Sequence, residues 1–167
     1  MKTILGFNFS NKTALIRVDF NVPLDASLQV ADNTRILSAK PTILKVLNDG
    51  GSCVLMSHLG RPKGNQANLS LSHIVSEIEK ILDKKVIFAP DCIGAETESI
   101  VNNIKPGDII LLENLRFYSE ETEGDVAFAE KLSKLGQVYV NDAFVSAHRN
   151  HSSTSVITKF FNKKKYL

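Results

Sequence analysis

The amino-acid sequence predicts an α/β fold in which a parallel β-sheet is covered by helices on both faces. Two observations lead to this class. Short apolar runs rich in β-branched residues recur five times, and segments long enough to form helices lie between them. Parallel strands need such long, right-handed connections. The expected architecture is therefore a Rossmann-like, doubly wound sheet in three layers, α/β/α.

The first half of the chain supplies two strands and two helices. The run "ALIRVDF" (14–20) predicts the first strand, and the helical segment 34–48 after it is closed by two adjacent glycines. The run "CVLM" (53–56) predicts the second strand. In the following segment, 70–82, apolar residues recur at helical spacing in "LSHIVSEIEKIL", which indicates an amphipathic helix.

The second half continues the alternation. Strands are predicted at 85–89, 108–114 and 137–142, and helices at 95–103 and 125–135, the last of these closed by Gly136. The continuous apolar character of the five strands predicts that each is buried. No repeat, low-complexity tract or linker divides the 167 residues, so a single domain, 1–167, is expected.

Composition argues against several classes of protein. The 20 basic and 18 acidic residues are distributed along the chain, without the broad basic field that nucleic-acid binding requires. No apolar run approaches membrane-spanning length, and the N-terminus is a poor signal peptide. Cys53 and Cys92 lack metal-site spacing, so they are expected to be reduced core thiols. These features indicate a cytoplasmic protein without nucleic-acid or membrane partners.

Polar residues gather where the predicted strands end. Ligands of such sheets bind in the crevice beyond the carboxyl ends of the strands, so these residues are candidates for a site. They are Asp19 and Asn21 after the first strand, Arg35 at the following helix, His58, Gly60 and Arg61 after the second, Arg116 after the fourth, and Asp142, His148 and Arg149 after the fifth.

The distribution of arginine points to the class of ligand. The chain has fifteen lysines but only five arginines, and four of the five fall at or after predicted strand ends. A guanidinium grips a phosphate or carboxylate through two parallel hydrogen bonds, which a lysine cannot reproduce. Converging arginines repel one another without an anion between them. The pattern therefore predicts a small, densely anionic ligand such as a phosphorylated carboxylic acid.

Each residue also has a simpler structural interpretation. A single arginine is more often paired with a surface carboxylate, which contributes only ~0 to 1 kcal/mol. His58 could cap a turn, Asp19 could bond backbone amides of its own turn, and Asp142 could orient a neighbour. Arg17 lies inside the first strand and is assigned a structural pairing, and His73 is assigned a structural role on its helix. The joint pattern favours a binding site.

Four motifs, in order along the chain, resemble the N-terminal domain of phosphoglycerate kinase. They are "RVDFNVPL", "SHLGRP", "LLENLRF" and "NDAFVSAHRNHSS", and together the resemblance covers essentially the whole chain. It implies binding of 3-phosphoglycerate or 1,3-bisphosphoglycerate, in an enzyme of glycolysis that transfers a phosphoryl group reversibly between 1,3-bisphosphoglycerate with ADP and 3-phosphoglycerate with ATP.

The resemblance also assigns residues. It implies that Asp19 and Asn21 contact the hydroxyl and carboxyl end of the glycerate, and that Arg35 is catalytic at the carboxylate that receives the phosphoryl group. The implied partners of the 3-phosphate are His58, Arg61, Arg116 and Arg149. The motif neighbours Phe20, Leu59 and Gly60 complete the implied substrate-binding set. One residue departs from the family: Val145 stands where glycine is usual, which puts the backbone freedom of that loop in question.

The chain contains no GxxxxGK[ST] pattern and no glycine-rich helix entry for nucleotide phosphates. The resemblance implies that a C-terminal domain, absent from this chain, binds Mg-ATP or Mg-ADP, so this chain holds no cofactor or metal. Phosphoryl transfer needs both halves of the cleft, and the chain alone is expected to be a monomer without turnover. Two alternatives stay open: a stand-alone binding module for phosphorylated carboxylic acids, or a structural domain with a vestigial site.

Overall fold

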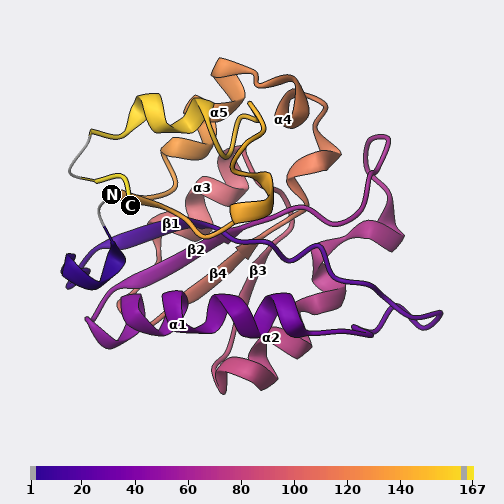
Figure 1. Ribbon diagram of the computed structural model, residues 1–167, viewed down its shortest axis with the longest axis horizontal. Helices are drawn as coiled ribbons and strands as arrows, with labels where there is room; N and C mark the ends of the chain where they lie inside the picture. Colours follow the sequence, from indigo (N-terminus) through magenta and orange to yellow (C-terminus); the bar gives the residue numbers. More distant parts are fainter. Residues whose placement is uncertain (1–2, 163–164) are drawn as a thin grey trace.

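A computed structural model describes residues 3–162 and 165–167 and confirms the predicted three-layer α/β/α fold (Figure 1). The sheet has the order β3-β4-β2-β1-β5, and all of its strand pairings are parallel. The strands are β1 (Thr13–Arg17), β2 (Ser52–Met56), β3 (Ile87–Ala89), β4 (Ile109–Leu112) and β5 (Val138–Asn141). The α-helices are α1 (Thr34–Asn48), α2 (Val75–Leu82), α3 (Ala95–Asn102), α4 (Glu120–Glu123) and α5 (Val126–Ser133).

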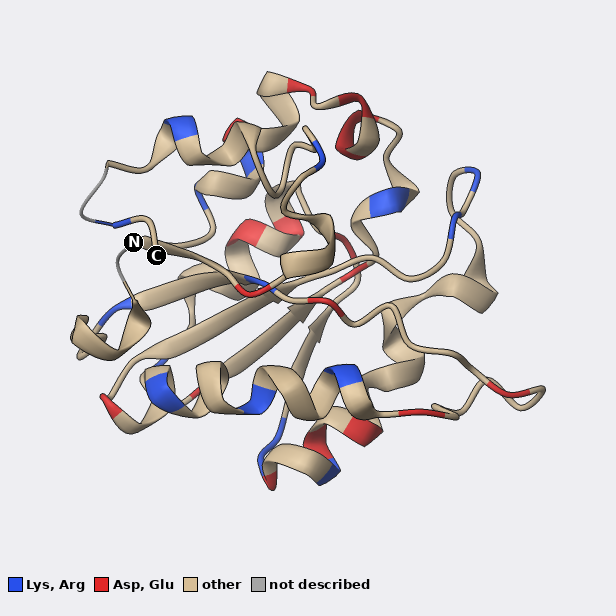
Figure 2. Ribbon diagram, in the orientation of Figure 1, with Lys and Arg blue, Asp and Glu red and all other residues tan. Residues whose placement is uncertain are grey.

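Successive residues of each strand enter opposite cores, because strand side chains alternate between the two faces of a sheet. On β1, Ala14 and Ile16 pack into the core beneath α1 and α2, whereas Leu15 packs into the core beneath α3 and α5. Figure 1 shows the two helical layers on either side of the sheet, and Figure 2 shows both signs of charge spread over them. Among the described residues, no helix is both long and apolar enough to cross a membrane.

Two of the predicted strands end two or three residues earlier than expected, because their last residues serve the connecting loops. β1 ends at Arg17 rather than at residue 20, and the Phe20 amide donates to Ser57 Oγ at 2.9 Å instead of joining the sheet. β4 ends at Leu112 rather than at residue 114. The Glu113 carboxylate accepts from the Leu71 amide at 2.8 Å, and Asn114 caps the 3-10 helix η4 (Leu115–Phe117). The loops at the carboxyl edge are thus tied to one another.

Other expectations need correction. β3 is an edge strand, and Ile87 is 43% exposed, so not every strand is buried.

The helix predicted over 70–82 begins as a 3-10 turn, η3 (Leu71–Ile74), because Ser70 Oγ accepts from the Ser72 amide. Cys53 and Cys92 are free and buried as predicted.

The open edge of β5 is covered by the last residues of the chain. The Tyr139 amide donates to the Lys165 carbonyl at 2.8 Å, and the Leu167 amide donates to the Tyr139 carbonyl at 3.0 Å. The sequence did not indicate this pairing. Positions 163 and 164 of this terminal segment lie outside the described residues. The pairing removes an exposed sheet edge.

Candidate anion-binding site

Two adjoining pockets open at the carboxyl edge of the sheet. The central pocket, of about 230 Å³, is lined by Asp19, Asn21, Arg35, His58, Gly60, Arg61, Arg116, Val145, Ser146 and Arg149. The outer pocket, of about 540 Å³, is lined by Arg61, Pro62, Lys63, Gly64, Arg116, Tyr118, Ser119, Thr122, Arg149 and His151. Three arginines line both pockets. The crevice therefore lies where the sequence predicted it, and its walls are predominantly basic.

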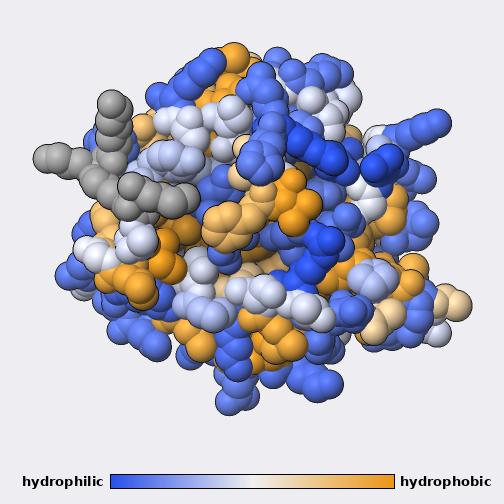
Figure 3. Space-filling view, in the orientation of Figure 1, coloured by the Kyte–Doolittle hydropathy of each residue, from blue (hydrophilic) through white to orange (hydrophobic). Residues whose placement is uncertain are grey.

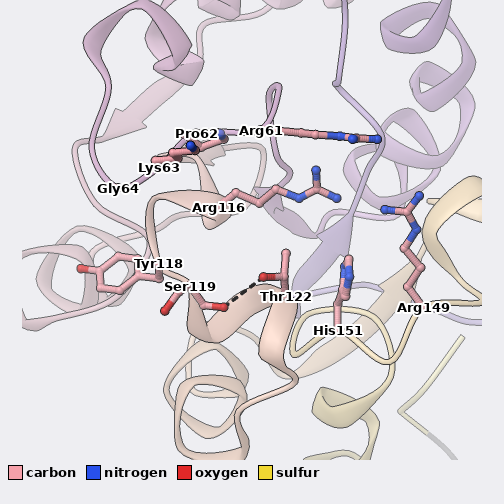
Figure 4. A pocket seen from close by; sticks show the side chains of 10 residues that line it. All are labelled: Arg61, Pro62, Lys63, Gly64, Arg116, Tyr118, Ser119, Thr122, Arg149 and His151. Atoms are coloured by element: carbon pink, nitrogen blue, oxygen red, sulfur yellow. Dashed lines mark hydrogen bonds between the residues drawn. The ribbon is translucent and has the colours of Figure 1, made fainter.

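Three guanidinium groups, of Arg61, Arg116 and Arg149, converge on this crevice from three separate loops (Figure 4). In the view, Arg116 lies below Arg61, and Arg149 lies to the right of both. Burial lowers the pKa of Arg116, and the nearby positive charges of Arg17 and Arg149 lower it further. Like charges held together in a partly desolvated place are costly unless an anion joins them. The geometry thus suits a phosphate or a carboxylate.

Arg116 is held on one side and free on the other. Its amide donates to Asn114 Oδ1 at 3.0 Å, and its Nη1 donates to the Gly60 carbonyl at 3.1 Å. Its Nε is buried without a hydrogen-bond partner. A buried donor without a partner is uncommon, because leaving one unsatisfied costs about 1 to 3 kcal/mol. An oxyanion in the crevice would remove that cost.

Gly60 links the first two strand ends to Arg116. Its amide donates to Asn21 Oδ1 at 2.9 Å, while its carbonyl accepts from Arg116. Its φ is +63°, a left-handed conformation, and a Cβ there would lie 3.0 Å from Leu69 Cδ2. The left-handed backbone therefore favours glycine, and a Cβ would also press on the Leu69 side chain. In this structure Asn21 orients the loop of the arginine clamp.

Arg35 at the start of α1 forms an ion pair with Asp19 at the far end of the central pocket. Because 45% of the Arg35 side chain is exposed, this pair adds little to stability. A third pocket of about 240 Å³ adjoins the pair and includes Asp142 and the exposed residues Phe144 and Val145. Figure 3 shows an apolar area over the segment leading out of β5, beside hydrophilic side chains. The crevice thus runs from the Arg35–Asp19 ion pair to an outer pocket whose charged lining residues are all basic.

His58 lies beneath the crevice with only 7% of its surface exposed. Its Nδ1 is 3.0 Å from Arg17 Nη2. Burial lowers the pKa of His58 to about 2, and the charges of Arg17 and Arg116 act in the same direction. The imidazole is therefore neutral at physiological pH, and a neutral imidazole has one N–H donor but no positive charge.

This low pKa predicts a pH-dependent loss of stability. Below pH 6.5 the unfolded chain binds a proton at His58 and the folded chain does not, so stability falls as pH falls. Between pH 7 and pH 5.5, the parent is expected to lose about 1 kcal/mol more unfolding free energy than a His58→Gln variant. Urea unfolding at the two pH values measures this difference. Equal losses in both proteins would contradict the low pKa.

The structure brings most of the predicted residues to the crevice, but not all. Asp19, Asn21, Arg35, His58, Gly60, Arg61, Arg116 and Arg149 line the central pocket. The side chains of Phe20 and Leu59 are buried in the core beneath α1 and α2, so only their backbone atoms remain available to a ligand. His148 lines neither pocket.

Sequence reasoning missed residues of the outer pocket. Ser119 and Thr122 line it from α4 and the residue before it, with Thr122 Oγ1 donating to the Ser119 carbonyl (Figure 4). His151 also lines it, and its Nδ1 is buried without a partner. Its position two residues after Arg149 was the one available signal. α4 was not predicted, because four residues are too short for a periodic pattern.

No group of three or more His, Cys, Asp and Glu side chains in the described ranges, 3–162 and 165–167, could hold a metal ion. The charged side chains that line the two pockets are mostly guanidinium groups, with Asp19 as the one carboxylate, and two buried imidazoles lie beside them.

The family model described as phosphoglycerate kinase matches residues 4–166 of this chain. The chain belongs to the phosphoglycerate kinase family.

Relatives of this phosphoglycerate kinase family member are much longer than the chain itself. The phosphoglycerate kinase of Aquifex aeolicus is 46% identical over 159 residues, which are 95% of this chain and 40% of that protein. That of Chloroherpeton thalassium is 49% identical over 160 residues, with the same coverage. The chain thus spans about 40% of the length of the curated relatives it matches.

Solved phosphoglycerate kinase structures share the fold. The enzyme from Coxiella burnetii superposes with a TM-score of 0.84 at 31% identity, covering 97% of this chain and 39% of the other. That from Pyrococcus horikoshii superposes with a TM-score of 0.86 at 29% identity, covering 96% and 41%. Val145, the departure from the family pattern, lies in the 3-10 helix η5 (Phe144–Ser146) and does not have a positive φ. Its conformation therefore does not require glycine.

Proposed function

We propose that this chain is the phosphoglycerate-binding half of a phosphoglycerate kinase. The whole enzyme would transfer a phosphoryl group reversibly between 1,3-bisphosphoglycerate with ADP and 3-phosphoglycerate with ATP. The observation that carries the proposal is the convergence of three arginines on one crevice, with the buried Nε of Arg116 left unpaired. A single phosphate can accept hydrogen bonds from several guanidinium groups at once.

The ends of the crevice suggest how the substrate is oriented. Its non-reacting 3-phosphate would lie among Arg61, Arg116 and Arg149, with His58 donating from below. The glycerate hydroxyl and carboxyl end would lie toward Asp19 and Asn21. Arg35 would turn from Asp19 to the carboxylate that receives the phosphoryl group, and would stabilise charge there. Exposure of its side chain leaves it free to do so.

Nucleotide binding is assigned to a second, C-terminal domain outside this chain, which itself forms one domain. The share of the relatives' length that the chain spans supports this division. Mg-ATP or Mg-ADP would supply or accept the phosphoryl group from that side. The described residues here offer no group of acidic, histidine or cysteine side chains that could hold the metal. In-line transfer needs donor and acceptor held together away from water, so the chain alone would bind substrate without turnover.

As half of a glycolytic enzyme, the chain is expected to act in the cytoplasm and to be monomeric. Size-exclusion chromatography with light scattering measures its mass directly.

Titration calorimetry at low ionic strength tests the binding. The chain is titrated with 3-phosphoglycerate, glycerol 3-phosphate, which lacks the carboxylate, and Mg-ATP. We expect 3-phosphoglycerate to bind most tightly and Mg-ATP not to bind. Equal affinity for both phosphate esters would mean that the carboxylate of 3-phosphoglycerate makes no favourable contact with Arg35. Absence of binding by either ester would favour the structural domain with a vestigial site.

A second measurement separates a kinase half from a stand-alone binding module. The nucleotide-binding domain of a relative such as the Aquifex aeolicus enzyme is added in trans, and ATP formation from 1,3-bisphosphoglycerate is followed. Turnover that depends on both pieces supports the kinase. Tight binding of phosphorylated acids, together with no turnover at any concentration of the added domain, would favour the stand-alone module.

A further inference from the structure

A line of buried polar side chains runs beneath the crevice. Arg17, Ser153 and Glu121 have no exposed surface, and His58 has almost none. They come from β1, from the segment before the 3-10 helix η6 (Val156–Phe160), from α4 and from the loop after β2. Groups distant in sequence thus meet in one buried place, and only His58 among them lines the central pocket.

In the hydrogen bonds that join these side chains, it is clear which group donates and which accepts. Arg17 Nε donates to Ser153 Oγ at 2.8 Å, and the Ser153 hydroxyl donates in turn to Glu121 Oε1. The Ser153 amide donates to Glu121 Oε2 at 3.0 Å. Arg17 Nη1 donates to the Val18 carbonyl. Both carboxylate oxygens of Glu121 therefore accept hydrogen bonds from Ser153.

The contact between Arg17 and His58 decides the tautomer of the histidine. A guanidinium has donors and no acceptor. Because Arg17 Nη2 lies 3.0 Å from His58 Nδ1, Nδ1 must accept and cannot bear a proton. A neutral imidazole then has its proton on Nε2. The low pKa of His58 agrees with this state.

We propose that Arg17 is a positioning residue that holds His58 as the neutral Nε2–H tautomer, and that Glu121, acting through Ser153, holds Arg17 in place. His58 then presents a fixed hydrogen-bond donor to the anion, and its contribution does not change with pH. The role as a donor to phosphoglycerate rests on the proposed function. The tautomer itself does not.

The charged and titratable groups around His58 fit this role. Arg17 faces it from β1, Arg116 from η4, and Arg149 and His151 from the segment after η5, and all of them oppose a positive charge on His58. Asp19, Arg35 and Arg61 line the same pocket. A protonated His58 would add to a positive cluster, whereas a neutral donor avoids the repulsion. Glu121 supplies the buried counter-charge to Arg17 from the opposite side.

The tautomer is tested directly by the nitrogen resonances of the His58 ring. The whole chain is labelled with ¹⁵N-histidine, and the signals of His58 are assigned by their loss in a His58→Gln variant. We expect an unprotonated Nδ1 and a protonated Nε2 from pH 8 to pH 5. A protonated Nδ1, or titration of the ring near pH 6.5, would overturn the proposal whether or not the chain binds phosphoglycerate.

The role of Arg17 is tested by a charge-balanced pair of substitutions. Arg17→Met with Glu121→Gln removes both buried charges together, so neither is left without its partner. We expect the His58 ring in this variant to show a mixture of the two neutral tautomers, because no guanidinium donor then faces Nδ1. Addition of His151→Gln should leave that mixture unchanged.

A folded double variant with unchanged His58 signals would reduce Arg17 to a purely structural residue and overturn the proposal. If the double variant does not fold, Ser153→Ala serves instead, since it removes the bridge between Arg17 and Glu121 with the smallest change of volume. Its His58 signals should then show mixed tautomers. Signals identical to the parent would contradict the part assigned to Glu121. Failure of 3-phosphoglycerate to bind the parent would refute the proposed function alone.

Discussion

Removal of the Arg116 side chain is expected to weaken binding of 3-phosphoglycerate by ~1.5 to 3 kcal/mol, which is the range for hydrogen bonds to charged groups. This corresponds to roughly a ten- to hundredfold higher Kd. Arg116 lines both pockets, and its Nε is unpaired and buried, so an anion in the crevice would satisfy it. Calorimetry of an Arg116→Ala variant measures the loss.

Arg61→Ala provides a second and cleaner measurement. Arg61 is exposed and lines both pockets, whereas Arg116 also holds the Gly60 carbonyl. A similar loss of affinity is expected in both variants. Lys105→Ala is the matched control, because Lys105 is an exposed cation four residues before the start of β4 at Ile109, at the opposite edge of the sheet. Unchanged affinity in both arginine variants would reject the assignment of the site.

Substitution of Gly124 by alanine is expected to lower the free energy of unfolding by about 2 to 5 kcal/mol. Gly124 ends α4 with a φ of +70°, and a Cβ there would lie 2.5 Å from the Asn150 carbonyl oxygen. The backbone strain accounts for about 1 to 2 kcal/mol of this loss, and the clash for the remainder. Urea unfolding measures the total.

Gly107→Ala separates the strain from the clash. Gly107 also has a positive φ, +92°, but no atom lies within 4 Å of the position of its Cβ. Its loss should be about 1 to 2 kcal/mol. Equal losses of unfolding free energy in the two variants would mean that the segment around Asn150 shifts without cost to relieve the clash. Because Asn150 lies between Arg149 and His151, Gly124→Ala should also weaken anion binding, whereas Gly107→Ala should not.

Local pattern was sufficient for the layers of this fold. The continuous apolar run around Val54 indicates a buried strand, and the spacing of Ile74, Ile78 and Leu82 indicates a helix. Strands and helices that alternate in this way allow few topologies. The arginines at strand ends could be predicted as a site for the same reason, since parallel strands bring their carboxyl ends to one edge. The edge position of β3 could not be predicted from the sequence, because a short apolar run occurs both in central strands and in edge strands.

The sequence by itself thus determined the α/β alternation and the edge of the sheet at which the arginines gather, and it predicted an anionic ligand there, because these depend on residue type and on spacing along the chain. Only the tertiary structure decided that Phe20 and Leu59 turn into the core, that His151 joins the crevice, and that Arg17 contacts His58. Arg17 and Ser153 are 136 residues apart, and their contact depends on how the layers pack. Such contacts leave no periodic trace in the sequence.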